Sequence, residues 1–144
     1  MLSGLFALAV AALFTGAAFY VNFAEQPARL KLKDRPLLAE WQKSYPLGFA
    51  MQAPLALIGF ILGAIAWWQT GKPAFLAGAL LILANWPWTL IAIMPTNKAL
   101  MATDLDKAGA KTRDLIVKWN KLHAVRTALG ALAVISFLFA LSAG

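Results

Sequence analysis

Three side chains share one face of the last apolar segment and could act together on a ligand. Trp119, His123 and Arg126 are spaced i, i+4 and i+7, so in a helix they project from the same side. A histidine titrates near neutral pH and can take or give a proton, while an arginine can hold an anionic oxygen. Side chains of these types on one helix face are therefore candidate site residues for proton transfer and anion binding.

Further polar residues occur near the ends of the other apolar segments. Asn22 and Glu25 lie three residues apart in the first segment, a spacing that puts them on one face of a helix. We expect Glu25 to orient His123 or to neutralise Arg126, because an arginine inside an apolar segment is costly to leave unpaired. The remaining candidate substrate-binding residues are Tyr20, Gln52, Thr96 and Asn97.

Each of these side chains also has a purely structural interpretation. His123, the sole histidine, could make a hydrogen bond that packs two helices, and Arg126 could extend to the lipid headgroups. Asn97 could cap a helix, Glu25 could be a solvated boundary charge, and Trp119 could belong to an interfacial aromatic belt. The sequence leaves these alternatives open.

Membrane-spanning helices are the elements that would position these residues. Hydrophobic residues make up 61% of the 144 positions and charged residues 13%, which is about half the usual share in a soluble domain. A helix needs about 20 apolar residues to cross the hydrocarbon core. The pattern predicts an all-α, integral membrane four-helix bundle in a single domain, with spans at about 2–23, 45–68, 74–94 and 119–141.

Basic residues are concentrated in two of the three connections. Five lie within 25–44 and five within 95–118, whereas the connection between spans two and three carries only Lys72. The positive-inside rule therefore predicts that the first and third connections face the cytoplasm and that both termini lie outside, in an inner (cytoplasmic) membrane. With this topology the polar ends of all four spans meet at one leaflet.

Prolines are expected to break the regularity of two spans. Pro54 should kink span two near Gln52, because it removes a backbone donor. Asn85 and Pro87 should interrupt span three, with the Asn85 amide satisfying carbonyl groups that Pro87 frees.

Other local features carry two interpretations each. Gly59 and Gly63 form a G-x-x-x-G pair, which allows close helix approach either within the bundle or between subunits. Residues 36–41 are either a short interfacial helix or a loop. A cleavable signal peptide is the rival interpretation of the first span.

Composition excludes several kinds of chemistry. The chain has no cysteine, which rules out thiolate catalysis, disulfide exchange and Cys-ligated metals. The net charge of +7 follows the connections rather than one amphipathic face, so no nucleic-acid partner is expected. We expect no metal and no cofactor, although a haem or metal ion held through His123 remains an alternative.

Three motifs taken together resemble a known family. The strings GAAFYVNFAEQPARL, MPTNKAL and WNKLHAVRTALG, in this order across four spans, are similar to the anthrone-oxygenase-like family of small integral membrane proteins. The resemblance covers essentially the whole chain. It implies a four-helix membrane bundle and, for the fungal polyketide-pathway members, oxidation of anthrones to anthraquinones with molecular oxygen and no evident cofactor; most bacterial members are of unknown function. The residues that match the motifs are Asn22, Glu25, Pro27, Arg29, Pro95, Thr96, Asn97, Trp119, His123 and Arg126.

A cofactor-independent oxygenase must make its substrate electron-rich enough to reduce oxygen. We expect His123 to remove a proton from the substrate and Arg126 and Asn97 to hold the developing oxyanion. Trp119 and Tyr20 would stack on a flat aromatic substrate that enters laterally from the membrane.

A non-catalytic function is the alternative from another class. A membrane protein that binds a lipid, a quinone or a partner helix could use the same polar cluster only to hold its helices together. The expected partners are membrane lipids and a small apolar aromatic substrate, and the sequence leaves a homo-oligomer open.

Overall fold

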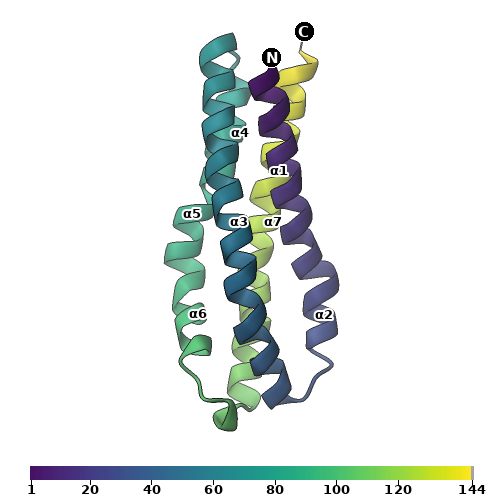
Figure 1. Ribbon diagram of the computed structural model, residues 1–144, viewed down its shortest axis with the longest axis vertical. Helices are drawn as coiled ribbons and strands as arrows, with labels where there is room; N and C mark the ends of the chain where they lie inside the picture. Colours follow the sequence, from purple (N-terminus) through teal and green to yellow (C-terminus); the bar gives the residue numbers. More distant parts are fainter. Residues whose placement is uncertain (144) are drawn as a thin grey trace.

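Long helices packed side by side form an elongated bundle in the computed structural model, which describes residues 1–143 (Figure 1). Helical structure runs over Leu2–Arg29, Asp34–Thr70, Pro73–Met101 and Ala110–Ser142, and each of these runs is long and apolar enough to cross a membrane. The predicted all-α architecture with four membrane-spanning helices is confirmed. The chain is a multi-pass membrane protein.

The first helical run changes its winding near its end. It comprises α1 (Leu2–Tyr20), a π-helical turn η1 (Val21–Glu25) and a short α2 (Gln26–Arg29). By contrast, α3 (Asp34–Thr70) is continuous and contains Pro46 and Pro54 without ending at either.

The third run is interrupted as predicted. It comprises α4 (Pro73–Leu83), α5 (Asn85–Trp88), a second π-helical turn η2 (Thr89–Ile93) and α6 (Met94–Met101). At the break, Nδ2 of Asn85 donates a hydrogen bond to the Ile82 carbonyl, 3.0 Å away. The amide thus satisfies one of the carbonyl groups at the helix end.

The last run is a single helix, α7 (Ala110–Ser142), which follows a short 3-10 turn, η3 (Leu105–Lys107). Figure 1 shows both chain ends at the end of the bundle where α3 joins α4. The connections before α3 and before α7 lie at the opposite end. Near that end, Nε of Arg113 lies 2.6 Å from Oδ1 of Asp34, and its guanidinium also donates to the Leu30 and Leu32 carbonyls.

The helices extend farther than the apolar segments that the sequence marks out. With 37 residues, α3 is about 55 Å long, well beyond a hydrocarbon core of roughly 30 Å. The charged regions 25–44 and 95–118 are therefore largely helical, including residues 36–41. Their inner faces carry buried apolar side chains such as Leu38, Trp41 and Leu100, which favour continuing the helices beyond the lipid.

Two apolar cores lie along the bundle, one on either side of a layer of buried polar groups. The core toward the termini is rich in alanine and includes Ala7, Ala11 and Phe137, so its helix backbones approach closely. The core toward the charged end includes Trp41 and Ile116. Between them lies the polar layer, which consists of the half-buried Asn22 and the buried Gln52, Thr89, His123 and Arg126.

The glycine pair of span two packs inside the bundle. A Cβ atom added at Gly63 would lie 2.8 Å from the Phe137 ring, and one added at Gly59 would lie 3.2 Å from Ile82. Both glycines are thus accounted for by close approach of helices within one chain.

Candidate functional site

A cavity opens within the polar layer and receives side chains from all four helical runs. Its empty volume is about 410 Å³, including its open side. The lining comprises Val21 from η1, Ser44, Tyr45, Gly48, Phe49 and Gln52 from α3, Thr89 and Ile93 from η2, Asn97 from α6, and Trp119, His123 and Arg126 from α7.

Both π-helical turns contribute to this lining. Val21 lies in η1, and Thr89 and Ile93 lie in η2. A π-helical turn inserts an extra residue into a helix and re-aims the side chains around it, which is why such turns are frequent at functional sites. Here the two turns border one cavity.

A hydrogen-bond network from η1 to α7 sets the tautomer of His123. Nδ2 of Asn22 donates to the Asn120 carbonyl at 3.0 Å and to Oδ1 of Asn120 at 2.6 Å. A backbone carbonyl only accepts, so the amide nitrogen of Asn22 must face Asn120, and its oxygen must face His123 and Thr127. Oδ1 of Asn22 lies 3.0 Å from Nδ1 of His123 and also accepts a hydrogen bond from Thr127. It follows that Nδ1 of His123 carries the ring proton.

The other ring nitrogen of His123 is the one that can act as a base. Within residues 1–143, Nε2 makes no hydrogen bond, and the side chain lines the cavity with 5% of its surface exposed. The neutral imidazole therefore keeps its Nε2 lone pair free. The Trp119 ring holds the imidazole in place, with ring centroids 4.9 Å apart.

Arg126 is held by neutral partners. Its Nη1 donates to Thr89 at 2.8 Å and its Nη2 to Oε1 of Gln52 at 3.1 Å, and the guanidinium lies over the Phe14 ring at 5.5 Å. No carboxylate of the described chain forms an ion pair with Arg126. A buried positive charge without a counter-ion favours an anionic group in the cavity that it lines.

Asn97 presents a second donor. Its Oδ1 accepts a hydrogen bond of 2.8 Å from Nε1 of Trp119, which fixes the orientation of the amide because the indole only donates. Nδ2 of Asn97 and Nε of Arg126 are both buried, and neither has a hydrogen-bond partner in the described chain. An unsatisfied buried donor costs about 1–3 kcal/mol, so a ligand with an acceptor oxygen would be stabilised here.

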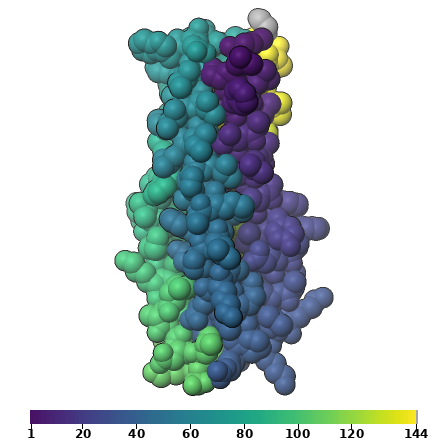
Figure 2. Space-filling view, in the orientation of Figure 1, coloured from purple at the N-terminus to yellow at the C-terminus, as the bar shows by residue number. Residues whose placement is uncertain are grey.

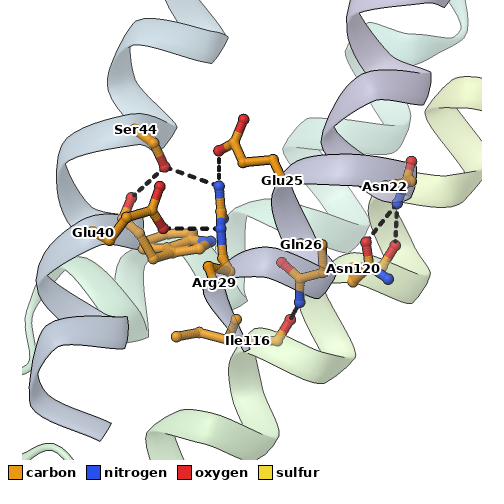
Figure 3. Close-up of polar contacts among 9 residues, drawn as sticks. Asn22, Glu25, Gln26, Arg29, Glu40, Ser44, Ile116 and Asn120 are labelled. Carbon is orange, nitrogen blue, oxygen red and sulfur yellow. Dashed lines mark hydrogen bonds and ion pairs between the residues drawn. The ribbon is translucent and has the colours of Figure 1, made fainter. Parts of the chain in front are cut away.

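Glu25 lies outside the cavity lining and pairs with a different arginine than expected (Figure 3). Its carboxylate contacts Arg29, whose Nε lies 2.9 Å from Oε2 of Glu40 and whose Nη2 donates to Ser44. The expected contacts of Glu25 with His123 and Arg126 are not found. Asn22 and Glu25 both belong to η1, and because a π-helical turn holds more residues than an α-helical one, a spacing of three no longer aligns them.

The structure brings together some of the predicted site residues and separates others. Gln52, Asn97, Trp119, His123 and Arg126 line the cavity, and Asn22 lies behind His123. Tyr20 is 60% exposed on the outer surface of the bundle, and Thr96 is buried but outside the cavity lining. Tyr20 and Thr96, predicted to bind substrate, and Glu25, predicted to orient His123 or neutralise Arg126, thus lie outside the cavity lining.

Several residues of the site were not predicted. Tyr45 and Phe49 follow Trp41 at helical spacing, and Trp41 and Tyr45 stack with centroids 4.9 Å apart. The helical spacing of these aromatic residues could have identified Tyr45 and Phe49 as part of the site. Asn120 and Thr127 flank His123 at i−3 and i+4, a spacing that could have identified them.

Metal-binding side chains do not cluster within residues 1–143. No three side chains of the types His, Cys, Asp and Glu gather there as a metal site would require.

The helices and the cavity define a class: a multi-pass membrane protein whose helical bundle contains a cavity lined by a histidine, an arginine and an asparagine. The model of the anthrone oxygenase family matches residues 41–136, and the chain belongs to this family. It is 31% identical to an anthrone oxygenase of Claviceps purpurea, over 96% of this chain and 87% of that protein.

A second relative supports the same family. The chain is 31% identical to anthrone oxygenase tpcL of Aspergillus fumigatus, over 63% of this chain and 62% of that protein. The predicted resemblance to anthrone oxygenases is therefore confirmed. No solved structure matches the chain.

Proposed function

We propose that the protein is a cofactor-independent oxygenase of a flat aromatic substrate of the anthrone type. The observation that carries the proposal is the contact of His123 Nδ1 with Oδ1 of Asn22, from which we infer that Nδ1 carries the ring proton and Nε2 is free to accept one. Membership of the anthrone oxygenase family supports the substrate class.

The reaction begins with removal of a proton from the substrate methylene carbon by Nε2 of His123. The electron pair of the broken C–H bond delocalises onto the carbonyl oxygen at the far side of the ring system, which becomes an oxyanion. Arg126 and Asn97 stabilise this oxyanion, because each has a buried donor without a protein partner. Trp119 packs against the aromatic rings of the substrate.

Molecular oxygen then adds to the electron-rich carbon. The anion transfers an electron to O2, the two radicals combine, and the peroxide takes the proton from His123 to give a hydroperoxide. Loss of the second methylene proton with cleavage of the O–O bond releases water and leaves a carbonyl group. One CH2 group and one O2 thus become one C=O group and one H2O, with no other reductant.

The membrane orientation that fits this function places the charged end of the bundle in the cytoplasm. The connections at that end and the helical extensions beside them carry most of the basic residues, which the positive-inside rule assigns to the cytoplasmic side of an inner membrane. The termini would then lie outside.

Oxygen uptake tests this function directly. The protein is reconstituted in phosphatidylcholine nanodiscs, supplied with 1,8-dihydroxyanthrone, and compared with protein-free nanodiscs to subtract spontaneous oxidation. His123→Gln should lower turnover by about 10²–10⁴-fold, the usual contribution of a general base. The matched control, Lys121→Ala, changes an exposed side chain of the same helix and should turn over as the wild type does.

Two outcomes would contradict the proposal. If the wild type consumes oxygen no faster than empty nanodiscs while it binds the corresponding anthraquinone, the cavity is a binding site without catalysis. If His123→Gln retains wild-type turnover, another group removes the proton.

A further inference from the structure

A groove on the outside of the bundle leads into the cavity. We call it the α1–α3 groove; it is lined by Ala17, Tyr20, Val21, Glu25, Ser44, Leu47, Gly48, Met51 and Gln52. Val21, Ser44, Gly48 and Gln52 line both the groove and the cavity. The two hollows therefore meet at these four residues.

Small residues of α3 lie at the junction between the groove and the cavity. A Cβ atom added at Gly48 would meet nothing within 4 Å, so close helix packing, which accounts for Gly63, does not account for Gly48. A glycine in a helix interior is less stable than alanine by about 1 kcal/mol. Together with Ser44, Gly48 leaves space where a larger side chain would separate the groove from the cavity.

The most exposed side chains of the groove are mainly apolar. Leu47 is 73% exposed, Tyr20 60% and Met51 52%. Figure 2 shows the face on which α3 runs between the N-terminal helical run and α5–α6. In a membrane, these exposed side chains would contact acyl chains, whereas the inner end of the path holds the unpartnered donors of Asn97 and Arg126.

The depth of the junction fits a ligand with one polar end. Gly48 lies 22 residues before Thr70, the end of α3, or about 33 Å along the helix, close to the thickness of the hydrocarbon core. The junction thus lies near the boundary between acyl chains and headgroups. A flat molecule with an apolar body and a phenol or carbonyl oxygen concentrates at this boundary.

We propose that the α1–α3 groove is the entrance through which a flat apolar ligand passes from the membrane into the cavity, with Gly48 setting the width of the opening. The ligand enters at the inner boundary of the bilayer and turns its oxygen toward Arg126 and Asn97. This inference rests on the proposed function, because the ligand is the substrate class named there.

The absence of native cysteine allows the entrance to be blocked without altering the cavity. Met51 lines the groove but not the cavity, so Met51→Cys labelled with pyrene maleimide should cover the opening. The matched control is labelled Ile61→Cys, since Ile61 lies on the same helix, is 53% exposed and lines neither hollow.

The probe is 1,8-dihydroxyanthraquinone, added to nanodiscs that hold each protein, with its association followed by quenching of tryptophan fluorescence. Relative to its unlabelled form, labelled Met51→Cys should associate with the probe about tenfold or more slowly. Labelled Ile61→Cys should keep its rate. Gly48→Leu should slow association as well, whereas Gly16→Leu should not, because Gly16 also has open space around it but lines neither hollow.

Different results would contradict the proposed entrance and the proposed function. If the wild type binds the probe and neither labelled Met51→Cys nor Gly48→Leu slows association, the entrance is elsewhere and the function stands. If the wild type does not bind the probe at all, both the function and the entrance are overturned.

Discussion

Oδ1 of Asn22, in the first helical run, lies 3.0 Å from Nδ1 of His123 in the last. Because Asn120 fixes the orientation of the Asn22 amide, this contact selects the imidazole tautomer with a free Nε2. A residue at one end of the sequence thus determines which nitrogen at the other end can act as a base.

Without the Asn22 amide, His123 should no longer be held in a single tautomer. In Asn22→Ala, both imidazole tautomers become populated, and we expect turnover to fall by about tenfold or more while the protein still inserts and folds. Because His123 is the sole histidine, ¹⁵N NMR of histidine-labelled protein reports its tautomer without assignment. A wild-type spectrum with the proton on Nε2 would contradict the proposed base.

The unpartnered donor of Asn97 can be removed without a change of shape. Asn97→Asp keeps an oxygen for the Nε1–H of Trp119 but replaces Nδ2 with an acceptor that repels an oxyanion. We expect turnover to fall by about 10²–10³-fold, as for loss of one oxyanion donor. The melting temperature should change little. Equal losses of stability and turnover would instead indicate a structural role for this amide.

Arg126 should not be replaceable by lysine. Its guanidinium reaches both Thr89 and Gln52 and still leaves Nε free, whereas an ammonium is a single point of charge. We therefore expect Arg126→Lys to lose most of the turnover and to bind 1,8-dihydroxyanthraquinone less tightly in an equilibrium fluorescence titration. If Arg126→Lys binds and turns over as the wild type does, positive charge alone is sufficient at this position.

The fold could be predicted from the sequence because lipid imposes a single simple rule. Apolar segments long enough to cross the membrane must be helical, so composition alone indicated four spans. The lengths of the helices could not be found in this way, since Leu38, Trp41 and Ile116 continue them beyond the apolar segments through packing between distant residues.

The site residues could be predicted only where the chain forms a regular α-helix, because the prediction relied on α-helical spacing. Trp119, His123 and Arg126 share an ordinary α-helix, and all three line the cavity. The position of Glu25 was predicted wrongly because the π-helical turn η1, which no sequence pattern indicated, rotates Glu25 away from Asn22. The partners of Arg126 were missed because Thr89 and Gln52 come from two other helices.

The buried ion pairs of Arg29 should matter for stability. Arg29 is 3% exposed and lies between Glu25 and Glu40 (Figure 3). Its guanidinium lies over the Trp119 ring, 5.8 Å from the ring centroid. Arg29→Leu leaves two carboxylates without a counter-ion, and breaking such a pair typically costs about 3–5 kcal/mol, reduced here because both carboxylates are partly exposed. We expect a clearly lower melting temperature in detergent, partly restored by adding Glu40→Gln. No restoration would indicate that packing on Trp119 dominates.

Close helix packing at Gly63 should be sensitive to a single methyl group. An added Cβ would lie 2.8 Å from the Phe137 ring and 3.0 Å from Cβ of Ala79, so Gly63→Ala forces α3 away from α4 and α7. Overpacking of this kind typically costs about 1–3 kcal/mol, more than the gain in helix propensity from glycine to alanine. Gly48→Ala is the matched control on the same helix, because its Cβ meets nothing within 4 Å and should leave the melting temperature unchanged or raise it. If both variants melt alike, the bundle accommodates the methyl group by moving Phe137, and the tight packing of this core is not what holds the helices together.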